Sequence, residues 1–95
     1  MTISFHPAAR RELLKYRRWY SERSEAAAEG FAREISHAIE RIVESPETYP
    51  LTRRQRRRFV LFKYPFDVIY SSSPTEIEII AIAHHSRKPH YWARR

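Results

Sequence analysis

The chain has 95 residues, a length that suits one domain and is too short for two. Apolar residues make up 42% of it and include five Phe, six Tyr and two Trp, which is enough for a modest hydrophobic core. It has no cysteine, so disulfides and thiolate metal sites are excluded. We therefore expect residues 1–95 to form a single domain without covalent staples.

The net charge of +7 is carried entirely by the second half of the chain. Residues 1–50 balance eight basic against eight acidic side chains. Residues 51–95 hold ten basic side chains and only three acidic ones, Asp67, Glu76 and Glu78. A surface of one sign attracts phosphates or an acidic polypeptide, although it also keeps a protein soluble. The working surface is therefore expected in residues 51–95.

No segment of the sequence predicts export or insertion into a membrane. Residues 1–7 lack the basic flank and the apolar run of a signal peptide. No apolar stretch approaches the roughly 20 residues that span a bilayer. We expect a soluble, cytoplasmic protein with no membrane partner.

Two helices are expected after a short strand over residues 2–6. Pro7 suits a first helical position, and the first helix runs to about residue 21. Ser24 favours the start of a second helix, and Pro46 favours its end. The apolar stripe of this second helix is the clearest periodic signal in the chain and consists of Ala28, Phe31, Ala32, Ile35, Ala38, Ile39, Ile42 and Val43.

The only glycine, Gly30, lies inside the second helix. It costs about 1 kcal/mol there relative to alanine. Close approach of the first helix is one explanation for a glycine at this position.

Three strands are expected in the rest of the chain. Residues 58–64 and 66–72 flank Pro65, which predicts a tight antiparallel hairpin, and residues 76–84 form the next strand. This last strand is apolar on both faces, so we expect it to be central in its sheet. Alternation assigns one face to Ile77, Ile79, Ala81 and Ala83, and the other to Ile80 and Ile82.

The predicted order of elements, β-α-α-β-β-β, defines an α+β fold. We expect two antiparallel helices to pack on one face of a small, largely antiparallel sheet. The other face of such a sheet stays open.

A run of arginines precedes the first strand of the hairpin. It places five guanidinium groups in six positions, at Arg53, Arg54, Arg56, Arg57 and Arg58. Guanidinium groups bind phosphates and carboxylates in a bidentate manner, so nucleic acid and an acidic peptide are both plausible partners. The run is weak evidence for nucleic acid alone, because no helix-turn-helix, zinc-finger or RNA-binding motif accompanies it.

The C-terminal tail, residues 84–95, combines histidines, cations and aromatic residues. Adjacent histidines on a strand point to opposite faces and no carboxylate lies nearby in sequence, so we expect no metal and no cofactor. One interpretation makes His85 or Tyr91 a proton-transfer group, with Arg87 holding a phosphate. The residues alone favour another, in which Tyr91 and Trp92 pack on the core while the cations face water.

Four pieces of the sequence, at these spacings, resemble the RelE/ParE superfamily of toxins from type II toxin–antitoxin systems. The resemblance covers essentially the whole chain. It implies the fold described above and a cognate antitoxin, with an acidic or amphipathic segment, that wraps and neutralises the toxin. The pieces are Ala9-Arg10-Arg11-Glu12-Leu13; Phe31, Ile35, Ala38-Ile39, Ile42, Ser45-Pro46 and Tyr49-Pro50; Phe62-Lys63-Tyr64-Pro65-Phe66-Asp67-Val68-Ile69-Tyr70; and Ala81-Ile82-Ala83-His84, Arg87, Pro89 and Tyr91-Trp92.

The resemblance leaves two targets open. RelE-like members cut messenger RNA on the ribosome, whereas ParE-like members inhibit DNA gyrase without hydrolysis. The RelE-like site implies two lysines and an arginine on the hairpin, and an arginine and a tyrosine in the tail. Aligning the hairpins puts Phe59 and Leu61 at the lysine positions and Asp67 at the hairpin arginine. His85 falls at the tail arginine, and only Tyr91 matches.

Losing one donor that stabilises an anionic transition state typically costs roughly 2.7–4 kcal/mol, so this departure favours the ParE-like branch. The expected function is growth inhibition through binding to gyrase, more consistent with a non-enzyme. The alternatives are a ribosome-dependent endoribonuclease that uses His85, Arg87 and Tyr91, and a non-toxic family member that binds an antitoxin. The expected target- or antitoxin-binding residues are Arg53, Arg54, Arg56, Arg57, Arg58, Lys63, Arg87, Tyr91, Trp92, Arg94 and Arg95.

Overall fold

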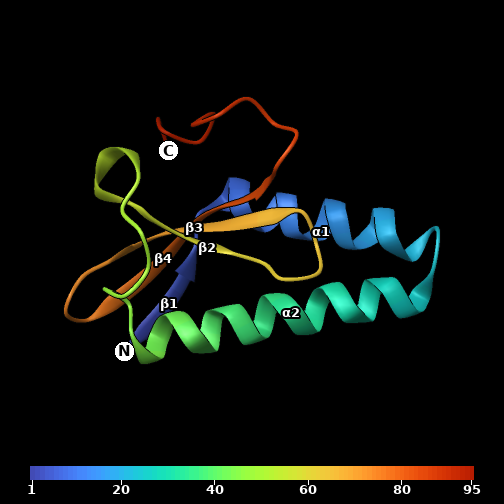
Figure 1. The fold of residues 1–95 in the computed structure, drawn as a ribbon, viewed down its shortest axis with the longest axis horizontal. Coiled ribbons are helices and arrows are strands. Elements are labelled where there is room, and N and C mark those ends of the chain that lie inside the picture. Colours follow the sequence, from blue (N-terminus) through green and yellow to red (C-terminus); the bar gives the residue numbers. More distant parts are fainter.

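A computed structural model describes residues 1–95 in full (Figure 1). Its elements follow the predicted order and confirm the α+β class. They are β1 (Thr2–Phe5), α1 (Pro7–Ser21), α2 (Glu25–Glu44), a short 3-10 helix (Arg53–Gln55), β2 (Arg57–Val60), β3 (Phe66–Ser72) and β4 (Glu76–His84).

The two helices begin and end close to the predicted positions. The His6 ring accepts a hydrogen bond from the Ala8 N–H at 3.1 Å, and the Ser24 hydroxyl accepts one from the Ala27 N–H at 3.2 Å, so both N-termini are capped. Helix α2 ends directly before Ser45-Pro46. Neither helix combines the length and the apolar character needed to cross a membrane.

The sheet has the order β1-β4-β3-β2, with β1 parallel to β4 and the other pairs antiparallel. Strand β4 is central, as its two apolar faces predict. The helices lie side by side over one face, antiparallel and joined by a short turn (Figure 1). The main core fills this interface and contains Ala9, Phe31, Ile35, Ala38, Ile42, Leu61, Phe66, Val68, Tyr70, Ile77, Ile79 and Ile82.

A β-bulge in β4 overturns the predicted assignment of its faces. Ile69 pairs with Ala81 and Tyr70 pairs with Ile79, so Ile80 is an extra residue without a partner. The extra residue reverses the alternation beyond it. As a result Ile82 joins Ile77 and Ile79 on the helix side, whereas Ile80, Ala81 and Ala83 lie on the other face.

The predicted tight hairpin around Pro65 is also wrong. Strand β2 ends at Val60, and residues 61–65 form a loop. The Leu61 N–H still donates across the hairpin to the Phe66 carbonyl oxygen at 2.9 Å, but the Lys63 N–H donates to a Glu34 carboxylate oxygen at 2.8 Å, so the ladder does not continue towards Pro65. Phe62, at the outer side of the loop, is 90% exposed.

The face of the sheet away from the helices is not open, contrary to expectation. The C-terminal tail folds back over it in a series of turns (Figure 1). Trp92 is only 4% exposed and packs with Ile69, Ile80, Ala81 and Ala83. A second, smaller core therefore holds the tail against the strands, since an indole of this size buries a large apolar area.

Gly30 faces the loop at residues 61–65 rather than helix α1. A Cβ added there would lie 2.5 Å from the Tyr64 hydroxyl oxygen. This hydroxyl donates a hydrogen bond to the Ala27 carbonyl oxygen at 2.9 Å. The glycine therefore provides the space through which the loop is tied to α2.

We predict that Gly30→Ala changes stability by different amounts in two backgrounds. With Tyr64 present the added methyl group displaces the hydroxyl, and the lost hydrogen bond of about 1 kcal/mol offsets the gain in helix propensity. In Tyr64→Phe the same change stabilises by about 1 kcal/mol, because the obstructing oxygen is gone. Urea denaturation of the four proteins measures this coupling, and equal gains in both backgrounds would contradict it.

Candidate functional site

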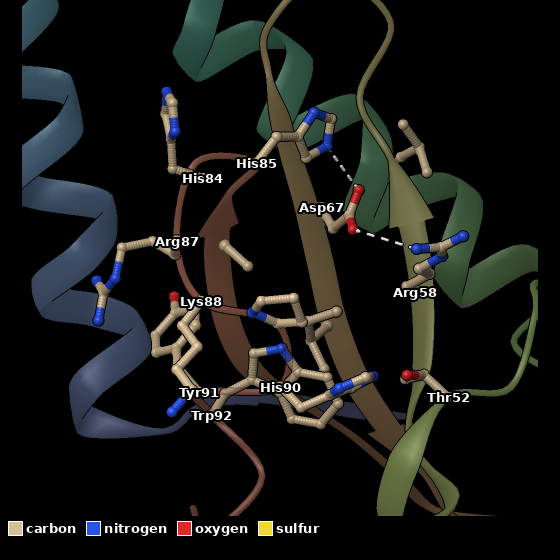
Figure 2. A pocket seen from close by; sticks show the side chains of 14 residues that line it. Thr52, Arg58, Asp67, His84, His85, Arg87, Lys88, His90, Tyr91 and Trp92 are labelled. Atoms are coloured by element: carbon tan, nitrogen blue, oxygen red, sulfur yellow. Dashed lines mark hydrogen bonds and ion pairs between the residues drawn. The ribbon is translucent and has the colours of Figure 1, made fainter.

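A cleft of about 460 Å³ lies on the tail-covered face of the sheet, between strands β2 to β4 and the tail (Figure 2). Cationic and imidazole side chains from the strands and from the tail line it. It is lined by Thr52, Arg58, Val60, Asp67, Ile69, Ala83, His84, His85, Arg87, Lys88, Pro89, His90, Tyr91 and Trp92.

Asp67 of β3 is the one carboxylate of the cleft. Its Oδ1 lies 2.8 Å from the His85 Nε2, and its Oδ2 lies 3.8 Å from the Arg58 Nη1 (Figure 2). The Asp67 side chain is 16% exposed, so this shared carboxylate is partly desolvated and its ion pair is less screened than one at an open surface. The arrangement neutralises the negative charge on the floor of the cleft.

Strand β2 directs alternate side chains to the helices and to the cleft. Phe59 and Leu61 pack towards the helices, whereas Arg58 and Val60 line the cleft. Strand β2 therefore gives the cleft one cation, Arg58, and one apolar side chain, Val60. Arg58 already forms an ion pair with Asp67.

The tail supplies the other cations of the cleft. The Arg87 guanidinium carbon lies 3.9 Å from the centroid of the Tyr91 ring, a cation–π contact. Arg87 and Lys88 are exposed and have no carboxylate within ion-pair distance. His90, with a φ of 61°, turns the chain so that Trp92 is directed into the second core. These side chains leave a positive rim on the tail side of the cleft.

A buried carboxylate of α1, Glu12, anchors the tail. Its Oε1 accepts hydrogen bonds from the Ile82 N–H at 3.0 Å and from the Arg95 Nη1 at 2.8 Å. Its Oε2 accepts from the Tyr91 hydroxyl at 2.6 Å and from the Arg95 Nη2 at 2.8 Å. Burial alone would raise the pKa of Glu12, but the hydrogen bonds from Arg95, Tyr91 and Ile82 outweigh it and lower this pKa.

The three residues proposed for the nuclease alternative meet in the cleft. His85, Arg87 and Tyr91 all line it. The Tyr91 hydroxyl, however, donates to Glu12, and burial together with this hydrogen bond raises the pKa of Tyr91 far above its usual value. The His85 ring nitrogen is engaged with Asp67. Proton transfer by Tyr91 would therefore require its contact with Glu12 to break, whereas the His85 ring keeps its second nitrogen, Nδ1, outside the contact with Asp67.

The arginine run separates into anchored and free side chains. Arg57 donates to the Tyr49 carbonyl oxygen at 2.7 Å, and Arg56 donates to the Arg95 carbonyl oxygen. Arg53 and Arg54 are exposed and form no side-chain hydrogen bond or ion pair, and Arg54 has a φ of 59°. The next residue, Gln55, is also left-handed, with a φ of 60°, and this conformation costs an L-residue about 1–2 kcal/mol.

The remaining predicted site residues lie in different environments. Lys63 is on the loop at residues 61–65, beside α2 and apart from the cleft. Trp92 is buried and Arg95 is engaged with Glu12, whereas Arg94 is exposed. No group of three or more metal-binding side chains is arranged to hold an ion.

Glu12 is the important residue that sequence reasoning did not single out. It lies three positions after the buried Ala9 and four before Tyr16, so it belongs to the inward face of α1. The sequence signal for its role was a carboxylate on the inward face of a helix, in a chain that ends in two arginines.

Comparison with known proteins agrees with the fold. A sequence model of the family described as "ParE toxin of type II toxin-antitoxin system, parDE" matches residues 3–89. A solved chain described as "Chromosomal ParDE TA system from P. aeruginosa" is 17% identical, with a TM-score of 0.75, and the match covers 88% of this chain and 95% of that chain. A search of curated protein sequences gives no match.

The structural likeness shows a fold shared with a chain of that ParDE system. Because the family match spans nearly the whole sequence, this chain belongs to the ParE toxin family of type II toxin–antitoxin systems. The family predicted from the four sequence pieces is thereby confirmed.

We predict that Glu12→Gln destabilises the protein by about 3 kcal/mol at pH 7, because it leaves Arg95 without its buried partner. The folded-state pKa of Glu12 lies below the ordinary 4.5, so the unfolded chain takes up this proton first as the pH falls. The ion pair therefore contributes fully above pH 4.5 and is lost below it.

Urea denaturation at pH 7 and at pH 3.5 measures this contribution. The difference in free energy of unfolding between wild type and Glu12→Gln should shrink at the lower pH. Glu29→Gln, at an exposed position of α2, is the matched control and should differ little from wild type at either pH. An unchanged difference for Glu12→Gln at the two pH values would refute the assignment.

Proposed function

We propose that this chain is a toxin that inhibits DNA gyrase by binding, and that a cognate antitoxin neutralises it. The observation that carries the proposal is the family match over residues 3–89. Inhibition of gyrase requires the protein to act in the cytoplasm. The basic cleft and its rim would then form a binding surface rather than a hydrolytic centre.

The geometry of the cleft supports a non-hydrolytic role. Cleavage of a phosphodiester without a metal needs cations and free proton-transfer groups around the reacting phosphate. Here the carboxylate of Asp67 already engages the side chains of Arg58 and His85, so neither is free to hold a phosphate. The hydroxyl of Tyr91 is bound to Glu12. Each missing transition-state donor costs roughly 2.7–4 kcal/mol, so these features disfavour catalysis.

The antitoxin is expected to combine acidic and apolar side chains. The free cations Arg53, Arg54 and Arg87 attract carboxylates. Large apolar side chains are exposed at Leu14 and Trp19 on α1, and at Phe62 on the adjoining loop. An amphipathic segment that covers both kinds of surface would match this distribution.

A second candidate function is a ribosome-dependent endoribonuclease. The observation that favours it is the close contact of His85 with Asp67 at 2.8 Å, beside Arg58 in the same cleft. A carboxylate that orients an imidazole is a common arrangement for a general base. In this case Arg87 would bind the phosphate, and Tyr91 would have to leave Glu12 to take part.

Two assays on one purified batch separate these functions. We expect inhibition of gyrase supercoiling together with intact messages in a translating extract, read by primer extension. Arg87→Ala should weaken the inhibition about tenfold, because it removes one charge-assisted contact of about 1.5 kcal/mol, whereas Arg11→Ala, at an exposed position of α1, should have little effect.

Other outcomes of the two assays would contradict inhibition of gyrase. Discrete cuts in translated messages with normal supercoiling would replace the proposal by the nuclease function. Normal supercoiling and intact messages, with no growth arrest on induction, would identify a non-toxic member that binds an antitoxin.

Charge should accelerate the association with the antitoxin. We predict that the association rate constant falls steeply between low and high salt, and that Arg53→Ala/Arg54→Ala reduces both the rate and its salt dependence. Stopped-flow or surface-binding kinetics measure both quantities. The control Arg11→Ala/Arg17→Ala removes the same charge from α1. A rate that does not depend on salt would rule out electrostatic steering.

A further inference from the structure

Glu12 joins three segments that are distant in sequence. Its two carboxylate oxygens accept four hydrogen bonds, from the β4 backbone and from the tail side chains Tyr91 and Arg95. The Glu12 side chain is 9% exposed and does not line the cleft. It therefore has no direct access to a molecule bound there.

A chain of contacts leads from Glu12 to the cleft. The Tyr91 hydroxyl is fixed by Glu12 at 2.6 Å, which fixes the orientation of the ring. The Arg87 guanidinium carbon lies 3.9 Å from the centroid of that ring. Arg87 is otherwise exposed and has no carboxylate partner, so the ring is the surface that restricts its rotamers (Figure 2).

We propose that Glu12 is a positioning residue for the cleft, which acts through Tyr91 to hold the Arg87 guanidinium where the target binds. The target in this statement is that of the proposed function. The placement of Arg87 by Glu12 is a property of the toxin alone and is tested without any target.

The first test is the side-chain NMR resonance of Arg87 in the full chain. Stacking on Tyr91 should shift the Arg87 Nε–H signal upfield of that of the exposed Arg94. In Glu12→Gln and in Tyr91→Phe the Arg87 signal should move towards the Arg94 position, because the ring is no longer held. Glu29→Gln should leave the signal in place. An Arg87 signal that stays unchanged in folded Glu12→Gln would overturn the proposal.

A second variant guards against loss of folding. Glu12→Met/Arg95→Met removes both charges together, and apolar replacement of a whole buried ion pair is often neutral for stability. It should fold and still show the displaced Arg87 signal, since Tyr91 has lost its acceptor. A native Arg87 signal in this double variant would also overturn the proposal.

The third readout is inhibition of gyrase supercoiling by the same proteins. Glu12→Gln should weaken inhibition about tenfold, as Arg87→Ala does. Glu12→Met/Arg95→Met should inhibit supercoiling at least as strongly as Arg87→Ala. Full inhibition by Glu12→Gln would contradict the proposal. If the wild-type protein does not inhibit supercoiling at all, the proposed function fails, and the NMR result alone decides the role of Glu12.

Discussion

The buried carboxylate of Glu12 is the constraint on which the second face of the molecule depends. A charge removed from water costs several kcal/mol unless hydrogen bonds and an opposite charge replace the solvent. Glu12 finds its four hydrogen bonds only when residues 91–95 return to the centre of α1 and meet the Ile82 N–H of β4. The ion pair with Arg95 therefore contributes mainly to the choice of tail conformation, since a buried pair is weak evidence for stability as such.

The cleft follows from the position of the tail. Helices cover one face of the sheet, and Trp92 covers part of the other, so the space left beside β2 and β3 becomes the cleft. Glu76 and Glu78 lie at the first end of β4, and His84, which lines the cleft, lies at the other. Two of the three acidic side chains of residues 51–95 are therefore separated from the cleft. Asp67 alone remains among the cations, and it is neutralised locally. The result is a positive surface that suits binding of an acidic partner.

Local patterns were enough to predict the helices, the Ser24 cap and the central strand, because helix periodicity and capping depend on neighbouring residues. The bulge at Ile80 and the loop at residues 61–65 depend on distant contacts, with the tail and with α2, that leave no local signal. For this reason the tight turn predicted at Pro65 is replaced by the loop at residues 61–65. From the sequence, Glu12 could be recognised only as a charge on the inward face of a helix. Its partners could not be predicted, because they lie some 70 to 80 residues away in the chain.

Native-state hydrogen exchange tests the central claim most directly, namely that one buried carboxylate holds the tail and so builds the cleft. The informative amides are those of Tyr91, Ala93 and Arg95, which donate within the turns of the tail. The account predicts that Glu12→Gln removes their protection while the amides of β3 and β4 remain protected, apart from Ile82. Retained protection of the tail in Glu12→Gln, or an equal loss across the tail and the sheet, would contradict it.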